Sequence, residues 1–209
     1  MTRDNGNVNP EFRGRTAFGT FLLVFGLLSV AASITLATEG FWLLKDGVQP
    51  SCNINPFFSC GNVMQSEEAH QFFTVPNYFW GIAGWGVVAA TGAVMLAGAT
   101  LARWYWRIFA IGMFAAWGFL MWLFTEAVYD IGFLCLWCMA TWTTQTIMVW
   151  IITPWLMREK LLFDNERVSR IGAAVLPYSW ILPVINLGAI ALLIIQHFPL
   201  LLPLLLNGN

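Results

Sequence analysis

Cys135-Leu136-Trp137-Cys138 stands at the start of a long apolar segment, and the rest of the chain can be interpreted around it. The remaining cysteines, Cys52 and Cys60, lie upstream in a polar stretch. On a helix, residues three apart lie on one face, so Cys135 and Cys138 can form a disulfide or present two sulfurs to one pocket. Two pairs, one in membrane-like sequence and one outside it, suggest that electrons pass from one dithiol to the other.

The composition is that of a membrane protein. Of the 209 residues, 58% are hydrophobic and 10% are charged, whereas a soluble domain averages about a quarter charged residues. Several windows of roughly 20 apolar residues indicate an all-α protein with several transmembrane helices. The net charge of -1 says little about partners, and the chain has no basic patch with interleaved aromatic residues of the kind that binds nucleic acid.

The apolar windows divide the chain into three regions. Residues 1–16 are polar and lack periodicity, so we expect a disordered cytoplasmic arm. Residues 17–157 are expected to form a four-helix bundle with an extracytoplasmic loop at 38–76. Residues 158–209 then supply a connector, a fifth transmembrane helix and a tail too short to cross again. The expected spans are roughly 17–37, 77–101, 108–129, 131–157 and 171–197.

The lysines and arginines predict the orientation. Nine of the ten fall in the arm, in the turn between spans two and three, or in the connector, and only Lys45 lies in the long loop. Short loops rich in these residues stay in the cytoplasm. We therefore expect the N-terminus inside and both cysteine pairs toward the extracytoplasmic side, where disulfides persist. The first span is longer than the apolar region of a signal peptide, so we expect it to remain uncleaved.

Three other interpretations of the cysteines stay open. Static disulfides are one, although a bridge within the first turns of a membrane helix closes too short a loop to remove much entropy. A four-cysteine zinc site has the right ligand number, but the unequal placement and the oxidising side disfavour it, so we expect no metal. Unrelated buried cysteines are the third. A relay is favoured because a helix N-terminus activates a thiol, and a mobile loop can carry its dithiol between partners.

The order and spacing of the motifs resemble the vitamin K epoxide reductase family, in particular its bacterial branch. Residues 51–60 read Ser-Cys-Asn-Ile-Asn-Pro-Phe-Phe-Ser-Cys, and they are followed by Ser66, by Pro76-Asn77-Tyr78-Phe79-Trp80-Gly81, and by Tyr129-Asp130 leading into the C-x-x-C. The resemblance covers roughly residues 17–157. DsbB-type quinone reductases use a similar relay of cysteine pairs, but their C-x-x-C comes first in the chain, whereas here it comes second.

The resemblance implies a four-helix bundle around a quinone, either menaquinone or ubiquinone, near the outer face. Cys138 would lie against the quinone ring, with Cys135 as its partner in the active disulfide. Cys60 would exchange with Cys135, and Cys52 with an external thioredoxin-like protein of the DsbA type. Asn77 matches an asparagine that hydrogen-bonds a quinone carbonyl.

Further site residues follow from the resemblance or, for the pocket wall and the proton path, from position in the chain alone. Ser66 matches a serine or threonine beside the loop cysteines. Trp142 stands where vertebrate members carry a tyrosine, so a hydroxyl donor is missing there, and both Trp80 and Trp142 are placed to line the pocket. Asp130 and Glu126, near the outer end of span three, could relay protons, although such residues are more often simply solvated.

The sequence thus predicts a multi-pass enzyme of the bacterial inner membrane that serves oxidative protein folding. It would reoxidise an extracytoplasmic DsbA-type protein and pass the electrons through both cysteine pairs to a quinone. The bacterial branch often carries a fused thioredoxin-like domain, whereas this chain ends at Asn209, so we expect a separate partner. The alternatives are a reductase of vitamin K quinone or its epoxide, and a non-catalytic membrane protein with structural disulfides.

Overall fold

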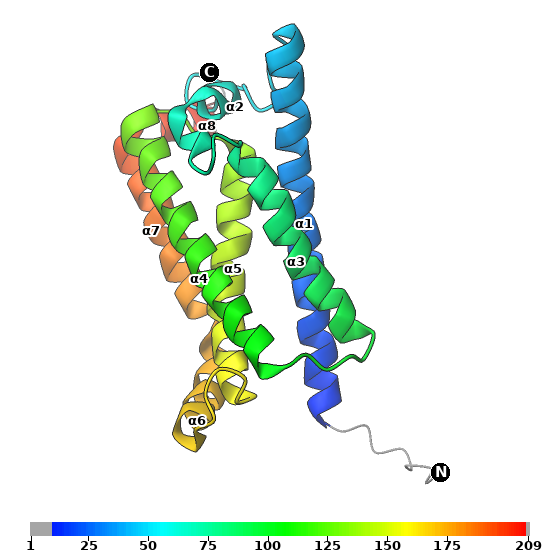
Figure 1. Ribbon diagram of the computed structural model, residues 1–209. Helices are drawn as coiled ribbons and strands as arrows, with labels where there is room; N and C mark the ends of the chain where they lie inside the picture. Colours follow the sequence, from blue (N-terminus) through cyan, green and yellow to red (C-terminus); the bar gives the residue numbers. More distant parts are fainter. Residues whose placement is uncertain (1–9, 208–209) are drawn as a thin grey trace.

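The computed structural model describes residues 10–207, with side chains from 14 to 204, and this part of the chain is a bundle of long helices without a strand (Figure 1). The all-α membrane class predicted from composition is confirmed. In chain order the elements are α1 (Pro10–Asp46), α2 (Cys60–Gln65), η1 (Glu67–His70), α3 (Asn77–Leu96), α4 (Arg103–Glu126), η2 (Ala127–Ile131), α5 (Leu136–Arg158), α6 (Glu166–Val175), η3 (Leu176–Tyr178), α7 (Ile181–His197) and α8 (Leu201–Asn207).

The chain runs up and down the bundle, and this path brings the two cysteine-bearing segments to one end. Figure 1 shows the beginning of α1 at the same end as the α3–α4 turn and α6. The opposite end carries α2, the α4–α5 connection and the C-terminal helix α8. We call residues 47–76, which close this second end between α1 and α3, the cap loop.

Helix α1 is longer at both ends than the sequence predicted. It begins at Pro10, so residues 10–16 of the expected disordered arm are helical, and residues 1–9 lie outside the described part. Proline is well suited to the first turn of a helix because it needs no N–H partner there. The helix ends at Asp46, where Gly47 adopts a left-handed φ of 68° and donates its N–H to the carbonyl of Leu43, a glycine cap.

Helices α1 and α3 approach closely through glycine. A Cβ on Gly92 would lie 2.4 Å from the backbone nitrogen of Leu23, and one on Gly26 would lie 2.7 Å from that of Ala89. Small residues allow helix backbones to approach in lipid, where packing rather than hydrophobicity drives association. The glycine-rich sequence of the second expected span therefore produces the closest helix pair of the bundle's first half.

Within the part of the chain that the structure describes, three helices are long and apolar enough to cross a membrane, namely Gly14–Asp46, Asn77–Leu96 and Arg103–Ile131, and α5 is not among them. Helix α5 carries several threonines and a glutamine, which lower its apolarity, and Thr141, Gln145 and Thr146 among them are buried. Gln145 donates to the carbonyl of Met113 at 2.5 Å, and the hydroxyls of Thr144 and Ser29 lie 2.7 Å apart. Inside a bundle such hydrogen-bond partners replace water. Helix α5 is therefore the central helix of the bundle, and its polar side chains are bonded to the helices around it.

The fifth expected span is bent. Glu166–Tyr178 and Ile181–His197 meet at 58°, and only together do they pass as one candidate span. The break follows Pro177, as a proline within a helical segment predicts. Helix α6 packs across the end of α5, where a Cβ on Gly172 would lie 2.6 Å from the nitrogen of Arg158. The long straight part is therefore α7 alone, rather than a helix over 171–197.

Candidate functional site

The C-x-x-C stretch lies across the beginning of a helix, not within it. We expected span four to start near residue 131, but α4 runs on into a π-helical turn, η2, and Gly132 then turns the chain with a left-handed φ of 71°. Cys135 has extended backbone and is the N-cap of α5, and its Sγ accepts a hydrogen bond from the backbone N–H of Cys138 at 3.4 Å. A helix N-terminus is a favourable place for an anionic sulfur, because unpaired N–H groups point at it.

The loop cysteines form a disulfide. Cys52 and Cys60 are bonded with their Cα atoms 5.7 Å apart, whereas Cys135 and Cys138 are free. The side chains of Cys52 and Cys60 are only 3% and 0% exposed. The expectation of a freely moving loop is thus corrected: in this structure the bonded pair is packed into the protein, so exchange with an external partner requires the cap loop to open.

A short backbone pairing holds the two cysteine pairs side by side. The N–H of Leu134 donates to the carbonyl of Phe57 at 2.8 Å, and that of Ser59 donates to the carbonyl of Leu134 at 3.0 Å. The pairing is parallel, with Phe58 opposite Leu134, so Cys135 follows directly after Leu134 and Cys60 stands two residues after Phe58. Both belong to one buried cluster, which contains Leu36, Cys52, Cys60, Met64 and Cys135.

Asparagine side chains shape the segment that carries the disulfide. Oδ1 of Asn55 accepts from the N–H groups of Phe57 and Phe58, each at 2.9 Å. Oδ1 of Asn53 accepts from the N–H of Gly61 at 3.1 Å. Asparagine favours such turns because its short side chain reaches the backbone of nearby residues. The Asn-Ile-Asn-Pro sequence is the local signal that would have predicted this fixed conformation.

An apolar cavity of about 470 Å³ opens beside the inner cysteines. It lies between the α1–α3 pair and the α4–α5 pair, and the cap loop closes its end. The structure brings most of the predicted site residues to its wall, namely Ser66, Asn77, Trp80, Cys135, Cys138 and Trp142. Asp130 is not part of this wall.

Two polar atoms at the cavity lack a partner among the described residues. Asn77 donates through Nδ2 to the carbonyl of Glu68 at 2.7 Å, but its Oδ1 is buried and unpaired. The indole N–H of Trp142 is likewise buried and unpaired. Buried polar groups normally have partners, so both atoms are suited to a ligand. The side chain at 142 lacks a hydroxyl, as the sequence indicated, but it offers an N–H donor.

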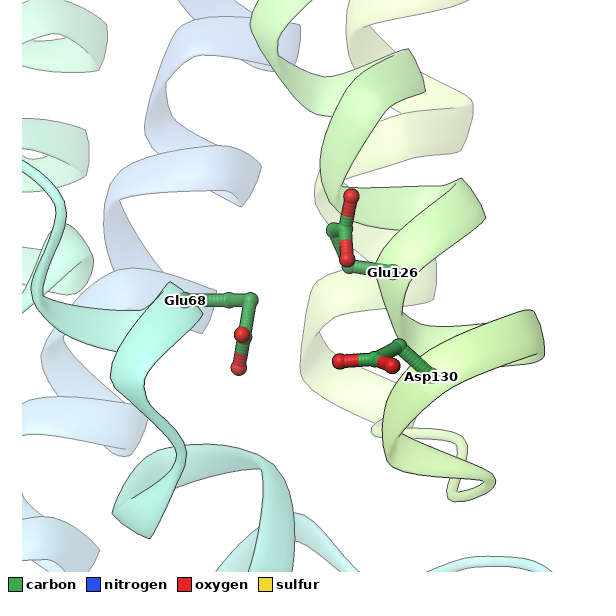
Figure 2. Close-up of side chains that lie close together, drawn as sticks. All are labelled: Glu68, Glu126 and Asp130. Carbon is green, nitrogen blue, oxygen red and sulfur yellow. The ribbon is translucent and has the colours of Figure 1, made fainter.

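Three carboxylates gather where the cap loop meets α4. Figure 2 shows Glu68 of η1 across from Glu126 at the end of α4 and Asp130 of η2, and one oxygen of each lies within 4.8 Å of the others. Glu68 also lines the cavity. The sequence suggested proton relay for Glu126 and Asp130 but not for Glu68, because only the folding of the cap loop over α4 brings that residue to them.

The C-terminal helices brace the cap loop, a role the sequence did not reveal. The ring of Phe198, just after α7, packs edge-on against Phe57 with centroids 5.7 Å apart. Ile190, Ile194 and Leu201 join the same buried cluster as Phe58, Leu134 and Trp142. The fifth span therefore contacts both segments that meet in the backbone pairing.

The comparisons with known proteins agree with this arrangement. The model of the vitamin K epoxide reductase family matches residues 20–153, which is more than half of the chain. No curated protein and no solved structure matches the chain significantly. The matched segment includes all four cysteines and the wall of the cavity. The chain therefore belongs to the vitamin K epoxide reductase family and is a membrane oxidoreductase.

Proposed function

We propose that this protein is a quinone-dependent thiol–disulfide oxidoreductase, which takes electrons from an extracytoplasmic dithiol protein and passes them through both cysteine pairs. One observation carries the proposal: the Phe58–Leu134 pairing sets the loop disulfide against Cys135 at the mouth of an apolar cavity that Cys138 lines. Thiol–disulfide exchange requires a sulfur to approach a disulfide directly, and this arrangement supplies that approach.

The transfer between the pairs runs from the loop inward. With the loop reduced and the inner pair oxidised, the Cys60 thiolate attacks Sγ of Cys135, and Cys138 leaves as a thiolate. Cys52 then attacks Cys60 and releases Cys135, so the loop regains its disulfide while the inner pair gains two electrons. A loop disulfide beside two inner thiols, as in this structure, corresponds to the state after this transfer.

The cavity fits a quinone. Its wall is almost wholly apolar and aromatic, and the unpaired indole N–H of Trp142 can donate to a ring oxygen. The unpaired Oδ1 of Asn77 is an acceptor, so it can bind only a hydroxyl of the reduced ring. Toward α3 and α4 it is lined by Gly84 and Gly112, where an added Cβ would meet nothing within 4 Å, so a long isoprenoid chain has room to leave toward lipid. When bound, the quinone would accept two electrons and two protons.

The protons that the reduced quinone takes up can pass through the three carboxylates of Glu68, Glu126 and Asp130. Glu68 touches the cavity and stands beside Glu126 and Asp130, and Asp130 is exposed. Carboxylates this close repel one another when all are ionised, which favours passing protons between them. We therefore assign proton delivery to these three side chains, with Ser66 supporting the adjoining turn through its hydrogen bond to the carbonyl of Val63 at 3.0 Å.

The proposed location is a bacterial cell membrane, with the end of the bundle that carries the cysteines facing out of the cell. The basic residues of the α3–α4 turn and of the α5–α6 connector lie at the opposite end, at Arg103, Arg107, Arg158 and Lys160. This charge distribution favours that end as cytoplasmic. The electron donor would then be a separate DsbA-type protein outside the cell membrane, and the acceptor menaquinone or ubiquinone within it.

The test is quinone reduction by the purified protein, followed through quinone absorbance with a reduced thioredoxin-like protein as donor. Wild type is compared with the four single Cys→Ala variants. Loss of turnover in the Cys135 and Cys138 variants, even with a small dithiol as donor, supports the inner pair as the active site. Rescue of the Cys52 and Cys60 variants by the small dithiol supports a shuttle role for the loop pair.

The same assay separates the alternatives. Full turnover by Cys138→Ala contradicts the electron path, and no turnover with any quinone favours a protein with structural disulfides. Vitamin K epoxide offered in place of quinone tests the remaining alternative, because turnover with the epoxide alone assigns the cavity to epoxide reduction.

A further inference from the structure

A single carboxylate of α1 contacts the loop disulfide. Glu39 lies two turns before α1 ends, and its Oε2 is 3.8 Å from Sγ of Cys52. Its other oxygen, Oε1, accepts hydrogen bonds from the backbone N–H of Ser51 at 3.3 Å and from the hydroxyl of Ser51. One oxygen therefore anchors the cap loop to α1, while the other faces the sulfur.

No cation neutralises this carboxylate among the side chains described. The three ion pairs of residues 14–204 lie elsewhere, at the α6 end of the bundle. Lys45, further along α1, is positioned over the rings of Phe41 and Trp42. Of the ionisable groups on the cap loop and α3, His70 bonds the carbonyl of Ser66, Glu68 faces the other acids, and the Tyr78 phenol lies against Gly40.

The two loop sulfurs thus have different surroundings. Cys52 has the Glu39 carboxylate beside it, whereas Cys60 stands two residues after Phe58, which pairs with Leu134, and packs in one buried cluster with Cys135. A like charge disfavours ionisation of a second group more strongly the closer it lies, so the effect is larger at Cys52, which contacts the carboxylate, than at Cys60. After reduction, a thiol at Cys52 can donate a hydrogen bond to Glu39, but a thiolate there would be repelled by it.

We propose, on the basis of the function proposed above, that Glu39 is a positioning residue that keeps Cys52 protonated after reduction and leaves the thiolate on Cys60. The carboxylate thereby determines which loop sulfur receives electrons from outside and which one attacks the inner pair. Glu39 touches neither donor nor quinone and acts through Cys52.

The chemistry balances as follows. A donor thiolate attacks Sγ of Cys52, the bond between Cys52 and Cys60 breaks, and Cys60 leaves as a thiolate. The second donor thiol then attacks the donor sulfur of the mixed disulfide, and its proton goes to the departing Cys52. The donor becomes a disulfide, having given up two electrons and two protons. The loop holds both electrons and one of the protons, and the other proton is released to solvent.

The charge also directs each attack. A thiol of lower pKa leaves faster, so attack on Cys52, which expels Cys60, is preferred over attack on Cys60, which would expel a sulfur beside a carboxylate. The Cys60 thiolate is then adjacent to Cys135, the sulfur it must reach. When Cys52 later closes the loop disulfide, its thiol proton is released as the bond to Cys60 forms again.

The test measures which loop sulfur ionises first. The full chain carries Cys135→Ser and Cys138→Ser, so that only the loop thiols react, and is reduced and alkylated with iodoacetamide at a series of pH values. Mass spectrometry gives separate rates for Cys52 and Cys60. Glu39→Gln removes the charge but keeps an oxygen for Ser51, while Ser51→Ala weakens the anchor and keeps the charge.

We expect the Cys60 rate to rise at lower pH than the Cys52 rate in the parent. Glu39→Gln should move the Cys52 profile to lower pH and raise its rate at pH 7 about tenfold, which corresponds to one pKa unit. The Cys60 profile should move less than the Cys52 profile, and Ser51→Ala should move neither. Coinciding Cys52 profiles in the parent and Glu39→Gln would overturn the proposal, as would an equal shift caused by Ser51→Ala. Alkylation needs no quinone, so a failure of quinone turnover in wild type would count against the proposed function and leave this result to be judged separately.

Discussion

Replacing Phe198 by alanine should loosen the cap loop and expose the loop disulfide. The Phe198 side chain is 7% exposed and packs edge-on against Phe57, which pairs with Leu134 through its carbonyl. Because Phe198 lies after α7 and not within the loop, its removal leaves the hydrogen bonds of the loop intact. The change acts on the contact between the C-terminal helices and the loop.

The size of the effect follows from this contact. An aromatic pair contributes about 0.5–1.5 kcal/mol beyond the burial of its area, and part of the buried ring area faces the loop. A loss of about 1.4 kcal/mol from the closed loop raises the open fraction tenfold. Cys52 and Cys60 are buried when the loop is closed, so reduction of their disulfide should accelerate about tenfold.

The assay is the rate of reduction by a small dithiol at low concentration, followed by alkylation and mass spectrometry. Leu200→Ala is the matched control, because Leu200 is two residues away and 68% exposed; its rate should equal that of wild type. Phe57→Ala combined with Phe198→Ala should be no faster than the faster single variant. A lower melting temperature of Phe198→Ala with an unchanged reduction rate would refute a bracing role for the C-terminal helices.

Three further predictions concern the packing of the bundle, the cavity and the exposed ion pair between Arg103 and Asp164. Gly92→Ala should destabilise the protein by about 1–3 kcal/mol, because its Cβ would meet the backbone of α1. Gly86→Ala is the control, because a Cβ there meets nothing within 4 Å, and it should be neutral or stabilising. Thermal melts followed by tryptophan fluorescence measure both. Trp142→Phe keeps an apolar ring but removes the unpaired N–H, so the KM for quinone should rise by about three- to tenfold with little change in melting temperature; an unchanged KM would exclude this donor. The Arg103 guanidinium, hydrogen-bonded to Asp164, lowers the pKa of that exposed carboxyl, so the pair stabilises the fold above the unfolded pKa of about 3.9 and this contribution is lost as pH falls below it. Asp164→Asn should therefore flatten the decline in melting temperature as pH falls below about 4, and an identical decline would show that the pair contributes nothing.

Several features of the fold were predictable from local sequence. Apolar windows located the membrane helices, and the turn at Gly47 and the break at Pro177 could be assigned from residue type alone. The fourth span was predicted at 131–157 and the structure has helix α5 (Leu136–Arg158) there, although its polar side chains keep it from passing as a span by hydropathy. Helix α5 is polar because it is central, and its Gln145 is bonded to α4. Hydropathy alone cannot distinguish a transmembrane helix whose polar side chains are buried in the bundle from a helix that does not cross the membrane.

The candidate site was predicted in part. The spacing of the four cysteines, with Asn77 and Trp142, identified the residues that line or adjoin the cavity, because the motifs preserve their order along the chain. The sequence did not predict that Cys135 caps α5, because the π-helical turn before it shifts the helix start. Nor did it predict that the loop cysteines are buried, which results from the pairing of Phe58 with Leu134.

The sequence by itself determined that this is an all-α membrane protein of the vitamin K epoxide reductase family with two cysteine pairs, because apolar run length and motif spacing are properties of neighbouring residues. Only the tertiary structure decided which groups meet across the bundle: Glu39 with Cys52, Glu68 with Asp130, and Phe198 with Phe57. These contacts join segments separated by helices or loops. Their formation depends on how the whole chain packs, and no local pattern of residues encodes that packing.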